Sequence, residues 1–187
     1  MACAVRSSLQ PIRLPDPAGC ELLLLRLEAV SVTVAVCYRP PDDDPALARL
    51  SELLEDLRGT GRLLLVGDMN LPEMQWQHRA GRVNPVILRR SGRACRFLDD
   101  CSLLGLEQWV HEPTRGPDML DLVFTRGMGC RASVRDGWLD SDHREVVATV
   151  DVPGWRPAVV TRTTALNYKR ADFVSHSCLG NYWMVSM

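Results

Sequence analysis

Several features are scarce or missing in this chain of 187 residues, and each absence removes a class of protein. No apolar run approaches the roughly 18 residues that a membrane-spanning helix needs, and residues 1–13 hold no signal-peptide core. The 7 cysteines are odd in number and form no Cys-x-x-Cys pair, so they predict reduced thiols rather than a disulfide framework or a zinc module. We therefore expect an intracellular protein, nuclear or cytoplasmic, that does not enter a membrane.

Lysine is almost absent: Lys169 is the only one, and the other basic residues are arginines. Arginine suits two-pronged phosphate contacts, although a coding bias is the simpler cause. The formal net charge of -1 gives no sign that the whole molecule attracts nucleic acid. Any attraction to phosphate groups must therefore be local, and we expect it at the densest basic stretch. The arginines of this stretch are Arg79, Arg82, Arg89, Arg90 and Arg93.

Hydrophobic residues make up 46% of the chain and charged residues 24%, which are values of a globular domain. Short β-branched or leucine-rich runs predict strands, and two segments with apolar residues at helical spacing predict helices. The expected strands are 21–27, 30–38, 63–66, 106–110, 120–125, 132–134 and 146–150, and the expected helices are 45–57 and 93–104. Asp44 is the expected N-cap of the first helix, with Pro45 at its first position. The segment between residues 73 and 93 reads as polar, without a regular element.

Beyond Pro153 the pattern weakens. We expect one domain over residues 1–153 and a connector with an irregular tail over 154–187. Residues 174–187 fit neither a helical nor a strand period, so we expect them to pack poorly. The oligomeric state does not follow from the sequence.

The most informative stretch runs from Arg62 to Pro72 and reads RLLLVGDMNLP. Its four apolar residues predict a strand buried on both faces. The strand stops at Gly67, and Asp68 and Asn70 follow. A rigid strand that ends in oxygen-bearing side chains can place a metal or phosphate site, although the same residues are also ordinary turn formers.

Similar features follow or precede the other strands. Tyr38 ends one strand, Asp121 begins another, and Asp142 and His143 precede a third. Each has a structural alternative, as a rim aromatic, a turn residue or a cap. Together they suit phosphodiester hydrolysis, which needs carboxylates for Mg²⁺ and a histidine held by a carboxylate. A Ser-His-Asp hydrolase lacks support, because the chain has no G-x-S-x-G elbow.

Four motifs carry a family resemblance in their order and spacing. They are YRPP at Tyr38, LLLVGDMNLP at Leu63, FLDD…GLEQWVHEPTRGPDMLDLVFT from Phe97, and SDHREVVATV at Ser141. Over about residues 20–150 the chain resembles the endonuclease/exonuclease/phosphatase superfamily, and within it the endonuclease domain of non-LTR retrotransposons. The later stretch NYKRADF looks like the connector toward reverse transcriptase in such polyproteins.

The resemblance implies a role for each candidate residue. Asp68 would position or activate the attacking water, and Asn70 would hold that water or a phosphate oxygen. Asp142 would be a ligand of Mg²⁺ or Mn²⁺. His143, oriented by Asp121, would donate to the scissile phosphate. Tyr38 would contact the phosphate, and Ser141 would have a supporting role at most.

The resemblance also implies a fold, with two sheets packed face to face and helices outside. Family members open with a half-domain that carries an Asn and a Glu metal ligand, and no such segment precedes Tyr38 here. We therefore expect an α/β protein, the C-terminal part of a four-layered sandwich, with an under-covered apolar sheet face and a weakly bound metal. The expected function is a truncated Mg²⁺-dependent DNA endonuclease of weak or no activity. The alternatives are a non-catalytic remnant that keeps the fold for binding, and a phosphatase of the same superfamily.

Overall fold

The computed structural model describes residues 3, 5–15, 21–41, 43–79, 82–87, 92–136, 141–155 and 184–186. At 44, 75, 77–79, 82–87 and 184–186 it describes the backbone alone. No helix in this part of the chain is long and apolar enough to cross a membrane.

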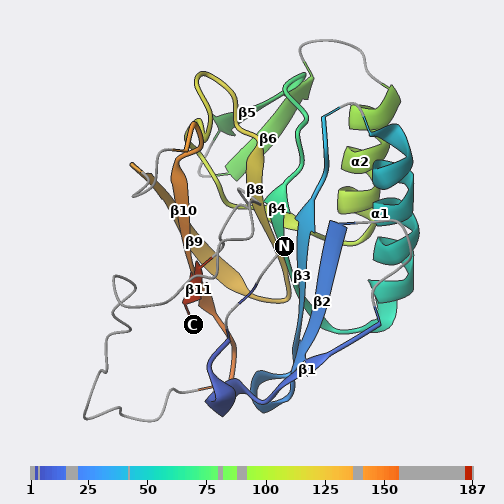
Figure 1. Cartoon of the computed structure of the whole chain (residues 1–187), viewed down its shortest axis with the longest axis vertical. Helices are drawn as coiled ribbons and strands as arrows, with labels where there is room; N and C mark the ends of the chain where they lie inside the picture. The colour runs from blue at the N-terminus through green and yellow to red at the C-terminus, as the bar shows by residue number, and fades with distance from the viewer. Residues whose placement is uncertain are drawn as a thin grey trace, which may run out of the picture.

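A mixed sheet of six strands forms the centre of the molecule, in the order β1-β2-β3-β4-β8-β7 (Figure 1). Its strands are β1 (Pro11–Arg13), β2 (Glu21–Leu27), β3 (Val32–Tyr38), β4 (Arg62–Asp68), β7 (Glu107–Gln108) and β8 (Asp121–Arg126). Only β3 and β4 run parallel, and the other neighbours are antiparallel. Because β3 and β4 are buried on both faces, they read as continuous apolar runs.

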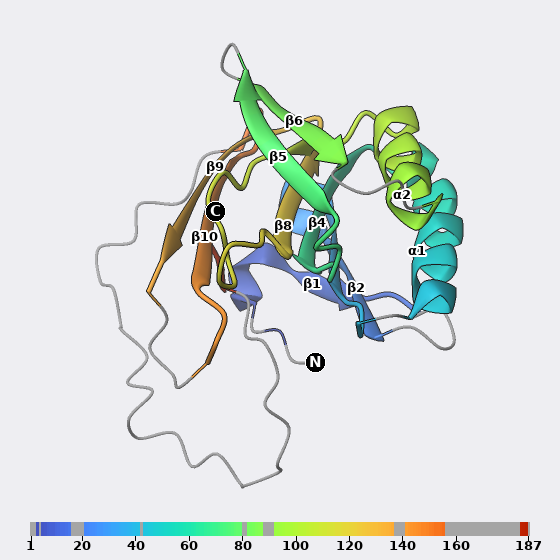
Figure 2. The ribbon, with the colours of Figure 1, turned by 90° about the horizontal axis from the view of Figure 1, so that it is seen from above.

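Two helices, α1 (Asp44–Asp56) and α2 (Gly92–Leu103), lie side by side on one face of this sheet (Figures 1 and 2). Short 3₁₀ turns occupy Ser7–Leu9, Glu28–Val30 and Leu57–Gly59. The expected N-cap of α1 is wrong by one residue. Asp43, not Asp44, accepts a hydrogen bond from the Ala46 backbone N–H at 2.9 Å. All three consecutive aspartates can cap, and the backbone path into the helix decides which one does.

A second, smaller sheet lies on the opposite face, with the order β11-β10-β9 (Figure 2). It contains β9 (Gly129–Arg135), β10 (Glu145–Asp151) and β11 (Met184–Ser186). β11 pairs with β10 in parallel, which the expectation of an irregular tail missed. Three residues are too few to show a strand period, so only the neighbouring strand reveals this element.

The two sheets share one core, and this overturns the expected exposed apolar face. Val34, Leu65 and Phe124 of the large sheet and Val134 and Ala148 of the small sheet belong to one buried cluster. Among the described residues the exposed large hydrophobic side chains are Ile12 and Leu103 alone. The layers are therefore helices, large sheet and small sheet, which agrees with the expected part of an α/β sandwich. In the part of the chain that the structure covers, no helix lies on the outer face of the small sheet.

A hairpin of β5 (Met74–Arg79) and β6 (Arg82–Ile87) extends from the end of the large sheet where β4 finishes (Figure 2). The sequence expectation placed no element here, because proline and charged residues interrupt any alternation. The base of the hairpin is anchored by Trp76, whose ring meets that of Phe124 edge to face at 6.0 Å. The NYKRADF stretch lies outside the described residues, so the domain boundary at 153 stays a prediction.

Candidate active site

The register of three strands brings three of the candidate residues into one row. Tyr38 pairs with Asp68 across β3 and β4, and Asp68 pairs with Asp121 across β4 and β8. Parallel β3 and β4 both end at this edge, whereas antiparallel β8 begins there. The expectation that these residues share one end of the sheet is therefore confirmed, and the cause is the pairing register.

Gly67 makes this register possible. Its φ is +153°, and a Cβ built on it would lie 1.8 Å from the backbone oxygen of Cys37. No side chain can occupy that space, so β3 and β4 approach closely only with glycine here. The glycine that the sequence suggested as a turn residue is instead part of the paired strand.

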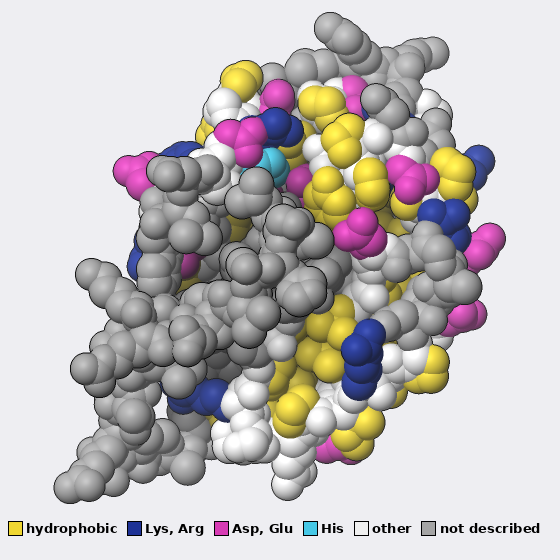
Figure 3. All heavy atoms as spheres, viewed as in Figure 1, with side chains coloured by type: hydrophobic (Ala, Val, Ile, Leu, Met, Phe, Trp, Pro, Cys, Tyr) yellow, Lys and Arg dark blue, Asp and Glu magenta, His cyan; other side chains and the backbone are white. Residues whose placement is uncertain are grey.

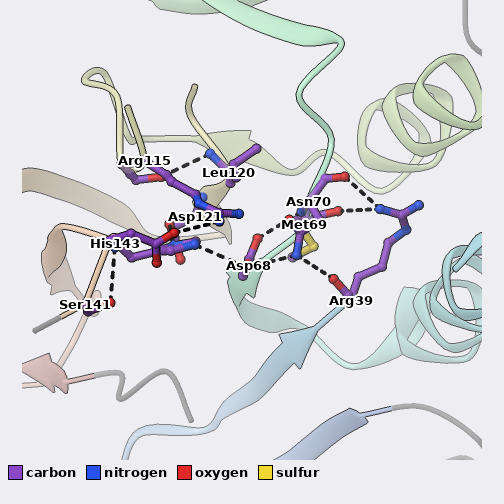
Figure 4. A network of polar contacts seen from close by, with 11 residues as sticks. Arg39, Asp68, Met69, Asn70, Arg115, Leu120, Asp121, Ser141 and His143 are labelled. Atoms are coloured by element: carbon purple, nitrogen blue, oxygen red, sulfur yellow. Dashed lines mark hydrogen bonds and ion pairs between the residues drawn. The ribbon is translucent and has the colours of Figure 1, made fainter. Parts of the chain in front are cut away.

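Asn70 fixes the carboxylate of Asp68. The Asn70 backbone N–H donates to Asp68 Oδ1 at 3.0 Å, and its side-chain Nδ2 donates to Asp68 Oδ2 at 3.0 Å and to the Arg39 carbonyl at 2.7 Å. Asn70 adopts a left-handed φ of 45°, which asparagine tolerates better than most residues. The amide therefore orients Asp68, and Figure 4 shows Asp68 between Asn70 and the His143–Asp121 pair.

Arg39 supports the loop after β4 through hydrogen bonds to its carbonyls. This role was not predicted from the sequence. The side chain of Arg39 is 1% exposed, and its Nη1 donates to the carbonyls of Met69 at 3.2 Å and Asn70 at 2.7 Å. An arginine directly after the strand that ends in Tyr38 was the available signal. A buried guanidinium that binds two consecutive carbonyls holds the Asp68–Asn70 turn in place.

Asp121 and His143 form the other half of the site. His143 Nδ1 lies 2.8 Å from Asp121 Oδ2, and His143 Nε2 lies 4.0 Å from Asp68 Oδ2. The predicted hydrogen-bond reach between Asp121 and His143 is confirmed. Thr114 holds the start of β8, because its buried Oγ1 accepts from the backbone N–H groups of Leu120 and Asp121 at 3.0 and 3.1 Å. Thr114 carried no sequence signal beyond its position in EPTRG.

The charges in this row shift two pKa values. Burial, and then the neighbouring charge of Asp121, raise the pKa of Asp68 to about 6, against the lowering effect of the Asn70 N–H, His143 and Arg115. The hydrogen bond to Asp121 raises the pKa of His143, although burial opposes it. At neutral pH the site therefore holds a carboxylate more basic than usual and a histidine that keeps its proton more readily.

Tyr38 stands at the margin of this cluster. Its side chain is half-buried, and burial, followed by the charge of Asp68, raises the pKa of its hydroxyl. The hydroxyl is therefore protonated at neutral pH and is available as a hydrogen-bond donor.

Asp142, the predicted metal ligand, faces solvent and a cation. Its carboxylate is 65% exposed and lies 2.6 Å from Nη2 of Arg115. Arg115 was not singled out from the sequence. The metal role of Asp142 remains a prediction, and Figure 3 shows histidine, acidic and basic side chains together on this part of the surface.

Of the five arginines predicted to contact DNA, the structure describes the side chain of Arg93. Arg93 is half-buried and its Nε lies 2.7 Å from Glu73 Oε1, so its charge is already balanced. The side chains of Arg79, Arg82, Arg89 and Arg90 lie outside the described part of the structure.

A pocket of about 470 Å³ opens beside Asn70. Its walls are mixed, with polar side chains from two arginines, an asparagine and an aspartate beside three prolines, a glycine and a leucine. The lining residues are Pro41, Asn70, Pro72, Arg93, Arg115, Gly116, Pro117, Asp118 and Leu120. Asn70 lines the pocket and also bonds the Asp68 carboxylate, so a ligand beside Asp68 can extend into the pocket.

The donor atoms fit a divalent cation. One ligand atom from each of Asp68, Asp121 and His143 lies within 4.8 Å of the other two. Two buried carboxylates at this spacing repel each other, as the raised pKa of Asp68 records, and a cation between them relieves that repulsion. Carboxylate oxygens suit Mg²⁺, and the added imidazole nitrogen also suits Mn²⁺.

Asp68, Asp121 and His143 thus lie together at one end of the large sheet of an α/β sandwich. The model of the endonuclease-reverse transcriptase family matches residues 32–147, and the chain belongs to this family. That match supports the resemblance to retroelement endonucleases and places every candidate residue within its span. None of the curated proteins compared with the chain matches it.

Proposed function

We propose that the chain is a divalent-metal-dependent DNA endonuclease that hydrolyses a phosphodiester bond at the Asp68–Asp121–His143 row. The observation that carries the proposal is the 2.8 Å contact of His143 with Asp121 beside a carboxylate of raised pKa. Family membership makes nucleic acid the expected substrate, and the retroelement resemblance makes DNA our choice.

His143 acts as a donor to the phosphate. Its Nδ1–H is used by Asp121, which fixes the tautomer and leaves Nε2 on the side of Asp68. A protonated Nε2 stabilises the charge that develops on the phosphate oxygens. Asp121 does not touch substrate in this scheme and positions the ring.

Asp68 accepts one proton of the attacking water as the water oxygen bonds to phosphorus. The bond from phosphorus to the leaving oxygen breaks, and the leaving oxygen takes a proton from solvent. A pKa of about 6 makes it a stronger base than an ordinary aspartate while leaving it ionised at neutral pH. Asn70 keeps both carboxylate oxygens in place. We propose that the Tyr38 hydroxyl donates a hydrogen bond to another phosphate oxygen.

Of the Asp68–Asp121–His143 cluster, Asp68 would hold the metal, because Asp121 and His143 are joined to each other by a hydrogen bond. The family resemblance implies Asp142 as the second protein ligand. When bound, Mg²⁺ or Mn²⁺ neutralises charge on the phosphate. Two carboxylates leave most of the coordination shell to water and substrate, which predicts weak binding and low activity.

The test is a supercoiled-plasmid nicking assay with Mg²⁺ and with Mn²⁺, in which we compare Asp68→Ala, His143→Ala and Asp121→Asn. The matched control is Asp99→Asn, an exposed carboxylate on α2. We expect a chelator to abolish nicking and each site variant to lower it on the order of 100-fold. The control should nick like the wild type.

Four results would count against the proposal. Nicking that survives chelation, or that the site variants leave unchanged, would remove these residues from catalysis. DNA binding without nicking would favour a non-catalytic module. Cleavage of a phosphate monoester but not of DNA would favour a phosphatase.

A further inference from the structure

Arg115 is placed by a rigid turn rather than by a mobile loop. Its N–H donates to the Asp118 carbonyl at 3.0 Å, and the Asp118 N–H donates back to the Arg115 carbonyl at 2.9 Å. Gly116 supplies a left-handed φ of +53° inside this turn. The adjacent Thr114 joins the turn to the start of β8. The base of the Arg115 side chain is therefore fixed relative to Asp121.

The charge of Arg115 acts on the catalytic row from outside it. The guanidinium opposes the rise in the pKa of both Asp68 and Tyr38, so it lies within electrostatic reach of both. It also lines the pocket beside Asn70. Figure 4 shows it on the His143 side of the site, near Asp121.

Arg115 can exchange its ion pair with Asp142 for another anionic partner at low cost. The pair with Asp142 is exposed, at 46% for the arginine and 65% for the aspartate, and such pairs contribute about 1 kcal/mol or less. A two-pronged contact between arginine and phosphate is stronger and geometrically more specific. The other arginine of the pocket, Arg93, is less exposed and is held by a largely buried Glu73.

A DNA phosphate that approaches this row meets the carboxylates of Asp68, Asp121 and Asp142. We propose that Arg115 binds a backbone phosphate of the substrate at the mouth of the pocket. Asp142 pairs with Arg115 while no DNA is bound and releases it when the phosphate binds. This inference rests on the proposed function and adds a substrate-binding residue to it. It adds an arginine contact at the turn before β8 to those expected over residues 79–93, which stay a prediction.

The experiment measures binding of a labelled DNA duplex to the full chain by fluorescence anisotropy in EDTA, over a range of salt concentrations. Neither metal nor cleavage contributes under this condition. Arg115→Gln should raise the Kd about tenfold and reduce the slope of log K against log salt by about one. Arg115→Lys should keep the slope and lose part of the affinity. The matched control is Arg131→Gln, a 77% exposed arginine 3.9 Å from Asp151, which should change Kd by about twofold or less.

A double-mutant cycle tests whether the Arg115–Asp142 ion pair competes with DNA for Arg115. Asp142→Asn alone should tighten binding several-fold, and the gain should vanish when it is combined with Arg115→Gln. Equal effects of Arg115→Gln and Arg131→Gln, or a gain that persists in the double variant, would overturn the inference. If such results accompany metal-dependent nicking, the proposed function stands without it. Absence of DNA binding by the wild-type chain at low salt would overturn both.

Discussion

Asp68 and His143 face each other across 4.0 Å, but the segments that carry them are built differently. Asp68 ends a fully buried strand with a paired neighbour on each side, and Asn70 binds both of its oxygens. His143 lies in the short segment before β10, where its own N–H donates to an exposed Ser141. The carboxylate side is fixed by the sheet. The histidine side is held by the contact of His143 with Asp121 and by the hydrogen bond from the Arg144 backbone N–H to the Thr114 carbonyl at 2.7 Å.

This difference indicates which part of the site lowers the stability of the fold and which part can rearrange when a substrate binds. A buried carboxylate beside a second one is held only because the surrounding strands over-determine its position. The exposed side, with Asp142 and Arg115, can change partners at little cost. A substrate that binds here should therefore reorganise the loop side and leave the strand side unchanged.

The largest effect is expected on the strand side of the site, where β4 carries Asp68. Gly67→Ala places a methyl group where the Cys37 oxygen lies 1.8 Å away, so β3 and β4 must separate. We expect a loss of about 4 kcal/mol or more in the free energy of unfolding, or failure to fold, measured by chemical denaturation. Gly59→Ala is the control, because nothing lies within 4 Å of its added Cβ. Near-equal stabilities of the two variants would show that the close approach of the strands is not required.

A smaller effect is expected from the free-energy cost of keeping the Asp68 carboxylate buried. The pKa of Asp68 rises from 3.8 to about 6 on folding, so between these values the unfolded chain has lost a proton that the folded chain keeps. Stability should therefore fall as the pH rises through this window, by on the order of 2–3 kcal/mol. His143 adds little slope there, because the ordinary pKa of 6.5 keeps it mostly protonated in the unfolded chain and the raised pKa keeps it protonated in the folded chain.

The measurement is the free energy of unfolding from pH 4 to pH 6 for the wild type and Asp68→Asn. The variant should lack this part of the slope, while Asp99→Asn should retain it. Identical slopes for wild type and Asp68→Asn would mean that the strand side carries no such cost.

The smallest effect is expected on the loop side. Ser141→Ala removes the 3.1 Å hydrogen bond from the His143 N–H, which is exposed. Stability should change by about 0.5 kcal/mol or less and nicking by about twofold or less. A loss comparable to that of His143→Ala would show that the loop side is as tightly specified as the strand side.

The sequence predicted the elements whose period is strong. The strand Glu21–Leu27 was expected with the bounds that it has, and both helices were expected within one residue at each end. The hairpin of β5 and β6 and the three-residue strands β1 and β11 were missed. Short or mixed-polarity strands leave no period of their own, and pairing with a neighbour defines them.

The sequence by itself determined which residues could do chemistry: Asp68, Asn70, Asp121 and His143 were all recognisable at strand ends. Only the tertiary structure decided how they are joined, because register is a relation between strands that no single segment contains. It assigned Asn70 to Asp68, Asp121 to His143, and Arg115 to Asp142. The contacts of Asp121 with His143 and of Arg115 with Asp142 join positions far apart in the chain. The space that Gly67 leaves open allows the central strands of the sheet to meet.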